Sequence, residues 1–176
     1  MPSIVHYMEN TSDEVSPVIG QITLAGGCFW GIEAGFREVP GILATVVGYT
    51  GGGVEHPDYT QVSTGKTGHV EAVRIAYDPN FISLGAILSR FLGLFDPTSE
   101  EGQQGSEGPQ YRSVIFCHTE EDCRTARAFI REEGASGKYT RPVVTAVNPA
   151  GIFWPAEDYH QKYYEKLGNR YRKPLF

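Results

Sequence analysis

Residues 21–36 read QITLAGGCFWGIEAGF, a short apolar run followed by two glycines and a helical pattern. Residues 21–25 predict a strand, and residues 28–36 predict a short helix because their apolar side chains recur at helical spacing. Cys28 then lies in the first helical turn, where unpaired N–H groups and the helix dipole favour a thiolate. The thiolate is the nucleophilic form, so we expect the pKa of Cys28 to lie below the usual value of about 8.5. The junction predicts a reactive thiol.

The rest of the chain continues with strands and amphipathic helices. Together with the first strand and helix, the order strand, helix, strand, strand, helix, strand predicts an α+β two-layer sandwich. Its core is a split β-α-β, ferredoxin-like arrangement with helices on one face and C-terminal helical additions. The further strands are expected at 42–49, 69–77, 111–117 and 143–147, and the further helices at 83–95, 120–133 and 156–167.

Length and composition indicate one domain. The chain has 176 residues, and 40% of them are hydrophobic, which suffices for an ordinary core. Residues 1–20 are polar and contain prolines, so we expect an irregular N-terminal arm followed by a single catalytic domain at 21–176. Residues 98–110 are rich in Gly, Glu, Gln and Ser, and a loop of that length is often functional.

The bulk charge excludes some classes of partner. A net charge of -6 argues against a dedicated binder of nucleic acid or of an anionic membrane. No apolar run is long enough to span a membrane, and the first 20 residues do not resemble a signal peptide. A cytoplasmic location is therefore expected, and the protein is expected to be a monomer. The isolated histidines do not have metal-ligand spacing, so no metal is expected.

The cysteine pattern indicates reduced thiols. Cys28, Cys117 and Cys123 form no CxxC pair, and an odd, small number of cysteines is no disulfide framework. Cys117 is predicted in a strand and Cys123 on the inward side of a helix, which favours structural roles for both. A lone cysteine such as Cys28 can equally be a small buried hydrophobic residue.

Five stretches, in the same order along the chain, resemble peptide methionine sulfoxide reductase of the A type, which reduces the S epimer of methionine sulfoxide. The resemblance covers roughly residues 21–166 and supports the same sheet-and-helix architecture. Any one stretch alone would be a weak signal, but the set is highly specific. The stretches are GGCFWG at 26–31, VGYTGG at 47–52, TGHVEAV at 67–73, QYRS at 110–113 and FWPAEDYHQ at 153–161.

The resemblance implies roles for individual residues. Cys28 would attack the sulfoxide sulfur, release methionine and keep the oxygen as a sulfenic acid. The substrates would be oxidised proteins that carry methionine sulfoxide, with the free amino acid as a further candidate. The polar residues around the sulfoxide oxygen would be Glu71, Tyr49 and Tyr111. Phe29 and Trp30 match the family's pocket for the substrate methyl. We also expect Asp158 and Tyr159 to line this pocket.

The chemistry independently requires these residue types. A sulfoxide oxygen leaves poorly unless it is protonated, so an acid must face the thiolate. Glu71 lies in a predicted strand beside apolar residues, and desolvation there would raise its pKa and keep it protonated. The phenols of Tyr49 and Tyr111 could hold the same oxygen. Alternatively, Glu71 would be an exposed carboxylate in a cross-strand ion pair, and the two tyrosines would be ordinary core residues.

The chain also departs from the family pattern. Ser106, with Glu107 beside it, stands where an acidic residue is usual, and Phe95 stands where a histidine usually precedes Asp-Pro-Thr. Many members carry recycling cysteines near the C-terminus, whereas this chain has no cysteine after Cys123. We therefore expect the sulfenic acid to be reduced by an external thiol: thioredoxin, glutaredoxin or a small-molecule thiol. No cofactor is expected.

Two other functions stay open at this point. An acyl transferase or thiol hydrolase would use Cys28 with His160 or His69 and would need a thiol–histidine hydrogen bond. A redox-sensing or oxidised-methionine binding module would use the same thiol without efficient turnover. Single-turnover activity without multiple turnover would favour the second.

Overall fold

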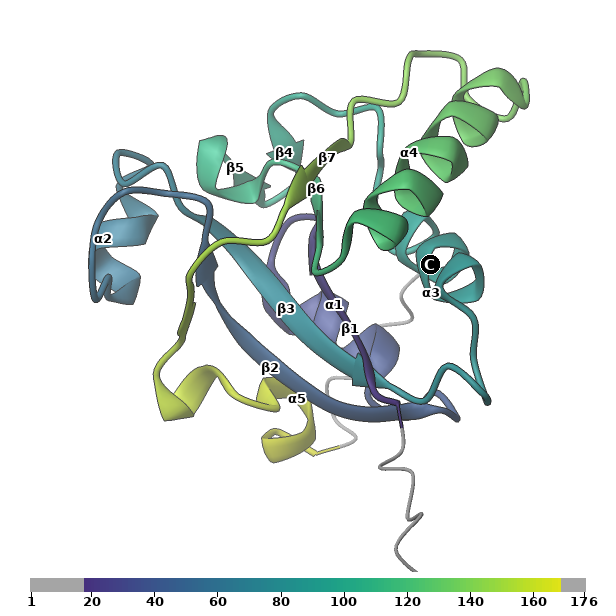
Figure 1. Cartoon of the computed structure of the whole chain (residues 1–176). Coiled ribbons are helices and arrows are strands. Elements are labelled where there is room, and N and C mark those ends of the chain that lie inside the picture. Colours follow the sequence, from purple (N-terminus) through teal and green to yellow (C-terminus); the bar gives the residue numbers. More distant parts are fainter. Residues whose placement is uncertain (1–17, 169–176) are drawn as a thin grey trace, which may run out of the picture.

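The computed structural model describes residues 18–168 and leaves residues 1–17 and 169–176 undescribed (Figure 1). Most of the predicted N-terminal arm therefore lies outside the described residues, and its last residue, Gly20, begins the first strand. Within the described range, no helix is long and apolar enough to cross a membrane.

A six-stranded sheet forms the centre of the molecule in the order β7-β6-β1-β3-β2-β8 (Figure 1). Neighbouring strands are antiparallel except β6 and β7, which are parallel. Its strands are β1 (Gly20–Ala25), β2 (Ile42–Thr50), β3 (Val70–Tyr77), β6 (Val114–Cys117), β7 (Ala146–Pro149) and β8 (Phe153–Pro155). A separate hairpin joins β4 (Gly102–Gln103) to β5 (Ser106–Glu107).

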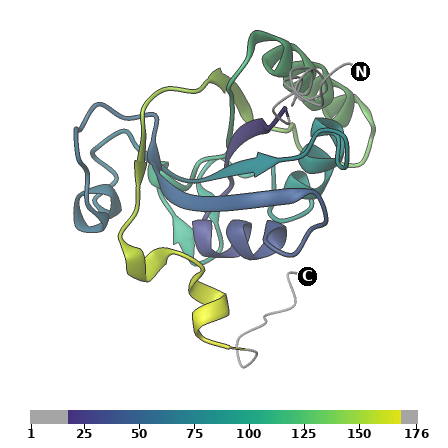
Figure 2. The ribbon, with the colours of Figure 1, turned by 60° about the horizontal axis from the view of Figure 1, so that its bottom comes forward.

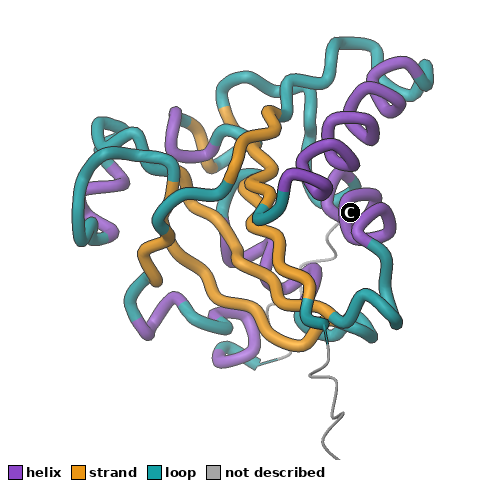
Figure 3. The backbone as a smooth tube through the Cα atoms, viewed as in Figure 1, coloured by secondary structure: helices purple, strands orange, loops and turns teal. Residues whose placement is uncertain are grey.

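The helices differ in length and pack mainly on one face of the sheet (Figure 3). Figure 2 shows α1 running along the sheet next to β2, with α5 beside it. The α-helices are α1 (Phe29–Phe36), α2 (Tyr59–Ser63), α3 (Leu84–Leu92), α4 (Glu120–Ala135) and α5 (Tyr163–Lys166), and the 3-10 turns are η2 (Pro109–Tyr111) and η3 (Asp158–His160).

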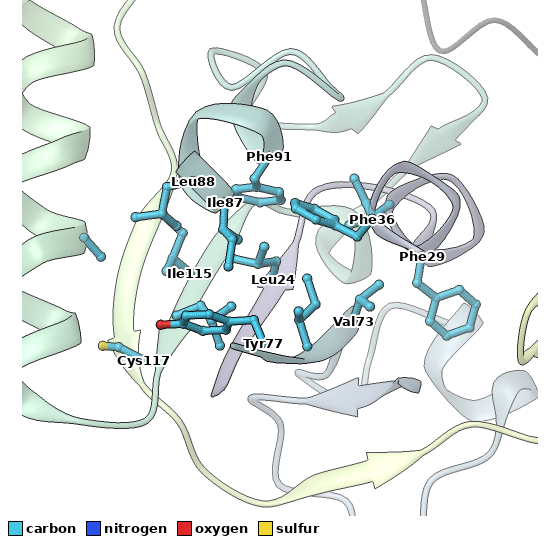
Figure 4. Close-up of a cluster of buried hydrophobic side chains, with 14 of the residues drawn as sticks. Leu24, Phe29, Phe36, Val73, Tyr77, Ile87, Leu88, Phe91, Ile115 and Cys117 are labelled. Carbon is cyan, nitrogen blue, oxygen red and sulfur yellow. The ribbon is translucent and has the colours of Figure 1, made fainter. Parts of the chain in front are cut away.

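The main core lies between the sheet and helices α1, α3 and α4. Strand residues such as Leu24, Val73 and Ile115 alternate toward it and are fully buried. Figure 4 shows them packed against helical side chains, among them Phe36 and Phe91. The opposite face of the sheet holds a smaller cluster that includes Val70, Val114 and Phe116, against which Ala150 and Phe153 pack.

The C-terminal region differs most from the prediction. The single helix expected at 156–167 is wrong, because Lys162 has a left-handed φ of 52° that separates η3 from α5. Just before it, Phe153–Pro155 pairs with β2 as an edge strand that the pattern did not predict. A run of three residues is too short for alternation to reveal it.

Three smaller differences concern element bounds. Helix α2 was not predicted, although Asp58 and Gln61 form a reciprocal capping box at its start. The strand expected from 111 begins at Val114, because Pro109–Tyr111 forms η2. The strand expected from 143 begins at Ala146.

The expectation of reduced thiols is wrong for two of the cysteines. Cys117 and Cys123 form a disulfide with their Cα atoms 5.2 Å apart, and Cys28 is the free thiol of the described residues. The pair forms because β6 ends at Cys117 and the chain turns at once into α4, whose first turns carry Cys123 back over the strand. The predicted positions are confirmed, since both residues are buried, one in a strand and one in a helix.

Candidate active site

The thiol loop lies where β1 ends and α1 begins. Cys28 is the N-cap of α1, with φ -61° and ψ 123°, so the helix begins at Phe29 and not at Cys28. Gly27 has a φ of 98°, which favours glycine, and a Cβ on Gly26 would stand 2.8 Å from the ring of Phe95. Gly27 is therefore required by its left-handed backbone conformation, and Gly26 is required because the Phe95 ring lies too close for a side chain.

The pKa of Cys28 is raised to about 11, first by burial and then by the negative charge of Glu71. Hydrogen bonds from the backbone N–H groups of Trp30 and Gly31 act in the opposite direction but are outweighed. The predicted low pKa is therefore wrong. The helix N-terminus does contact the sulfur, but the desolvation of a half-buried thiol beside a carboxyl group costs more than two N–H groups recover.

Glu71 lies in β3 directly opposite Tyr49 of β2. Its side chain is buried, 3% exposed, and Oε2 accepts a hydrogen bond of 3.1 Å from the backbone N–H of Phe29, the residue after the thiol. Burial raises the pKa of Glu71 to about 7, and the Phe29 hydrogen bond only partly offsets this. The raised pKa predicted from the strand pattern is confirmed, and the reading as an exposed ion-paired carboxylate is wrong.

Tyr49 and Tyr111 approach the same site from different elements. The Tyr49 ring is fully buried, and its hydroxyl donates a 3.0 Å hydrogen bond to Glu157 Oε1. Burial raises its pKa, and the charge of Glu157 raises it further. Tyr111 ends η2, and its pKa is raised by burial and then by the charge of Glu71. Both phenols are therefore neutral near pH 7.

Phe29 and Trp30 take different positions. The Phe29 ring is 1% exposed and lies 5.8 Å from the ring of Tyr49 and 5.1 Å from that of His160. Trp30 is half-buried and stacks on Tyr163 at 3.7 Å, and its Nε1–H donates to His160 Nδ1 at 3.0 Å. Phe29 is thus a core residue next to the thiol in sequence. The side chain of Trp30 is fixed by its stacking on Tyr163 and its hydrogen bond to His160.

Tyr159 packs against the aromatic residues around His160, whereas Asp158, among the described residues, has no contact with these rings. The Tyr159 ring is 4.0 Å from His160, and its hydroxyl donates to Glu157 at 3.4 Å, while 56% of the residue is exposed. Asp158 is exposed, and its backbone carbonyl accepts a 2.7 Å hydrogen bond from Lys166 Nζ.

Sequence reasoning missed three residues of the site. Glu157 joins Tyr49, Tyr159 and the backbone of Tyr59. Tyr59 is hydrogen-bonded to Tyr111, and Tyr164 lies close enough to Cys28 for a thiolate charge to raise its pKa, after burial has done so. The capping box at Asp58 and Gln61 could have signalled a helix carrying Tyr59, and Glu157 lies in the stretch 153–161 that resembles the family, whereas nothing in the local pattern marks Tyr164.

The C-terminal segment is fastened to the sheet and to α1 by side chains that bind backbone. Gln161 accepts from the N–H of Val47 at 3.0 Å and donates to its carbonyl at 2.9 Å, so it extends the edge of β2. Glu33 of α1 is buried and accepts 2.6 Å and 2.8 Å hydrogen bonds from Lys162 N–H and Thr45 Oγ1. These contacts hold η3 and the start of α5 against β2 and α1.

Neither predicted histidine partner forms a dyad with Cys28. Both ring nitrogens of His69 bind the loop that follows β2, since Nδ1 accepts from Gly52 N–H and Nε2 is 2.7 Å from the carbonyl of Val54. His160 Nδ1 is occupied by Trp30. Within residues 18–168, no group of three or more His, Cys, Asp or Glu is placed to hold a metal ion.

Ser106 lies in the hairpin of β4 and β5, opposite Gln103. The Gln103 side chain packs over Gly27, because a Cβ on that glycine would meet it at 2.8 Å. The hairpin therefore borders the thiol loop.

Comparison with known proteins gives consistent results. The family model described as "Peptide methionine sulfoxide reductase" matches residues 20–175. "Peptide methionine sulfoxide reductase MsrA" of Methanoculleus marisnigri is 52% identical over 146 residues, which are 83% of this chain and 89% of the relative. The protein of the same name from Geobacter metallireducens is 46% identical over 87% of this chain and 94% of its own.

Solved structures agree with the sequence relatives. Reduced Mxr1 from Saccharomyces cerevisiae superposes with a TM-score of 0.81 at 32% identity, over 89% of this chain and 90% of its own. Mxr1 in complex with Trx2 gives a TM-score of 0.59 at 26% identity, over 83% and 85% of the two chains. Because the family model matches residues 20–175 and relatives of 46% and 52% identity cover most of the chain, this chain belongs to the peptide methionine sulfoxide reductase family.

Proposed function

We propose that the protein reduces the S epimer of methionine sulfoxide to methionine in oxidised proteins, with the free amino acid as a further candidate substrate. The observation that carries the proposal is the pairing of Cys28 with Glu71, whose pKa is raised by burial to about 7 and which binds the backbone beside the thiol. A neutral carboxylic acid next to a nucleophile is what the protonation of a poor leaving oxygen requires.

The reaction begins with the transfer of one proton from the Cys28 thiol to the Glu71 carboxylate. At neutral pH Cys28 holds a proton and Glu71 is about half ionised, so transfer from sulfur to carboxylate creates a thiolate and an acid together. Glu71 then protonates the sulfoxide oxygen, and the Cys28 sulfur attacks the substrate sulfur. This attack forms an S–S bond, which then breaks together with the substrate S–O bond as the hydroxyl passes to the Cys28 sulfur. The substrate sulfur keeps an electron pair and leaves as methionine, and Cys28 becomes a sulfenic acid.

The other site residues would bind and orient the substrate. Tyr49, directly opposite Glu71 in the sheet, and Tyr111 are neutral phenols that would form hydrogen bonds with the substrate oxygen group. Trp30 and Tyr159 would contact the substrate methyl and chain, with Phe29 supporting the pocket from below. For Asp158, which is exposed, a role in substrate binding stays a prediction from the sequence.

An external thiol would complete the cycle. The first thiol displaces water from the sulfenic acid to form a mixed disulfide, and a second releases Cys28 and leaves as the disulfide product. The Mxr1–Trx2 complex of a structural neighbour supports thioredoxin as this reductant, while glutaredoxin and small thiols remain alternatives. A monomeric catalytic domain at 21–176 and a cytoplasmic location also remain predictions. The strand order β6-β1-β3-β2 supports the split β-α-β description of its core.

The test of this function is methionine release from the separate S and R sulfoxide epimers of a blocked methionine, with dithiothreitol as reductant. We expect multiple turnovers with the S epimer and none with the R epimer. Equal use of both epimers would contradict the assignment. Release of a single equivalent of methionine, with no further turnover across several reductants, would favour a sensing or binding module instead.

The pH dependence follows from the shared proton. Below about pH 7 both Glu71 and Cys28 are protonated and no thiolate is available, whereas above about pH 11 neither group holds the proton. We expect kcat/KM for methionine release to rise through about pH 7 and to fall only in strong alkali. In Glu71→Gln the levelling-off near pH 7 should be lost, and the rate should instead keep rising toward the raised pKa of Cys28, because the thiol must then ionise by itself. A rate that falls as pH increases from 6 to 8 would refute the scheme.

The Cys117–Cys123 disulfide is expected to stabilise the fold without taking part in turnover. Cys117 pairs with Ile22 in β1, whereas Cys28 follows the other end of that strand, and Figure 4 shows Cys117 and Phe29 at opposite ends of the core. Replacing both cysteines with serine should lower the free energy of unfolding by about 2 kcal/mol, as expected for a short closed loop. Turnover with dithiothreitol should be unchanged below the melting temperature. Loss of turnover in a folded variant would instead make the pair a resolving couple.

A further inference from the structure

Glu157 connects three separate segments of the site through one carboxylate. Oε1 accepts the 3.0 Å hydrogen bond from the Tyr49 hydroxyl at the end of β2. Oε2 accepts from the backbone N–H of Tyr59 at 3.2 Å and from the Tyr159 hydroxyl at 3.4 Å. Every one of these partners is a donor, which suits an ionised carboxylate because that group can only accept.

The surroundings keep this carboxylate charged. Burial acts to raise the pKa of Glu157, but the hydrogen bonds it accepts, those from Tyr49 and Tyr59 among them, together with nearby His160, hold the pKa below its ordinary value. Glu157 is therefore a permanent negative charge at the edge of the site near pH 7. Glu71, by contrast, titrates near pH 7.

The hydrogen bond fixes what Tyr49 can offer to a ligand. A phenol has one proton, and Tyr49 gives it to Glu157, so only the lone pairs of its oxygen remain for another partner. A hydroxyl that donates to a carboxylate is also polarised and becomes a better acceptor. Tyr49 and Glu71 are directly opposite each other in β2 and β3, so their side chains share one face of the sheet.

We infer that Glu157 is a positioning residue that presents Tyr49 to the substrate as a hydrogen-bond acceptor and not as a donor. The inference rests on the proposed reductase function. When Glu71 gives its proton to the sulfoxide oxygen, the O–H bond of Glu71 breaks and a new O–H bond forms on the substrate, which becomes cationic. That new O–H group donates to Tyr49, and the chain from substrate through Tyr49 to Glu157 stabilises the positive charge.

The first experiment compares Glu157→Gln with the native protein in single-turnover methionine release. Glutamine keeps the size of the side chain but removes the charge and can leave the Tyr49 proton free. We expect the rate to fall about tenfold to a hundredfold, the effect of losing a charged hydrogen-bond partner. The steady-state KM for substrate should change less than about threefold, because the contact through Tyr49 forms with the protonated substrate and not with the neutral sulfoxide that binds first. Glu121→Gln, the same change on the exposed side of α4, is the matched control.

A double-mutant cycle separates this role from a merely structural one. If Glu157 acts through Tyr49, adding Glu157→Gln to Tyr49→Phe should lower the single-turnover rate less than about twofold. The Tyr49 hydroxyl that Glu157 positions is already absent from that background. Losses that multiply in the double variant, or a Glu157→Gln rate equal to the native rate, would overturn the inference. Either result with a native protein that reduces methionine sulfoxide would leave the proposed function intact.

A measurement on the native protein covers the case in which Glu157→Gln does not fold. The hydroxyl proton of Tyr49, assigned by its loss in Tyr49→Phe, should exchange slowly with water in NMR spectra. It should be lost when Glu157 is protonated in acid. A rapidly exchanging hydroxyl at neutral pH would overturn the inference. A slowly exchanging one in a protein that reduces neither epimer would refute the proposed function and the role derived from it.

Discussion

Replacing Cys28 with serine is expected to abolish methionine release from the S sulfoxide. The serine hydroxyl is far less acidic than a thiol, and its oxygen cannot accept the substrate oxygen to form a sulfenic acid. The backbone N–H groups of Trp30 and Gly31 would remain in place, so the fold around the N-cap of α1 should persist. The loss should therefore come from chemistry alone.

The measurement is single-turnover methionine release, combined with labelling by a sulfenic-acid probe such as dimedone. The native protein should release one equivalent without reductant and gain one label, whereas Cys28→Ser should do neither. The Cys117→Ser/Cys123→Ser variant is the matched control and should retain both signals, because its change lies at the other end of β1. Any label on a Cys28→Ser protein, or release from it, would assign the nucleophile to another residue.

Glu71→Gln is expected to lower the rate of methionine release while it stabilises the protein. An amide cannot donate the proton that the sulfoxide oxygen needs, and losing a general acid costs about a hundredfold to ten-thousandfold in rate. Its carbonyl can still accept the hydrogen bond from Phe29 N–H. The fold should thus keep the contact that orients the thiol loop.

The stabilisation follows from the direction of the pKa shift. The pKa of Glu71 is about 7 in the fold against an ordinary 4.5, so the native state binds more protons than the unfolded chain between those values, and stability falls as pH rises. Above pH 7 the ionised group costs about 3 kcal/mol, at about 1.4 kcal/mol per pH unit, and glutamine avoids that cost. Chemical denaturation at pH 8 should show the gain, and at pH 4 the two proteins should be similar. A less stable variant at pH 8 would contradict the burial argument.

Much of the site could be predicted because its elements are local. The thiol loop of Gly26, Gly27 and Cys28 is a strand-to-helix junction visible in consecutive residues, and the alternation in β3 places Glu71 beside buried Val73. Such patterns depend only on backbone periodicity. The raised pKa of Glu71 followed from the same alternation, because burial alone dominates it.

Other features depended on contacts that no local pattern contains. The pKa of Cys28 was predicted in the wrong direction because the helix N-terminus is local. The burial that raises this pKa most, and the charge of Glu71 that raises it further, come from elements distant in sequence, Glu71 being 43 positions further on. The disulfide required knowing that α4 turns back over β6. The C-terminal helix was wrong because Glu33 and Gln161 hold that segment in a different backbone path.

The sequence by itself predicted the strand-to-helix junction, the candidate nucleophile, the buried carboxyl group and, through its motifs, the family. Only the tertiary structure decided the charge state of the thiol, the pairing of Cys117 with Cys123 and the convergence of Tyr49, Tyr59 and Tyr159 on Glu157. The division has one physical reason. Periodicity reports which face of an element is buried, whereas pKa values and hydrogen-bond direction depend on the groups that distant elements bring against that face.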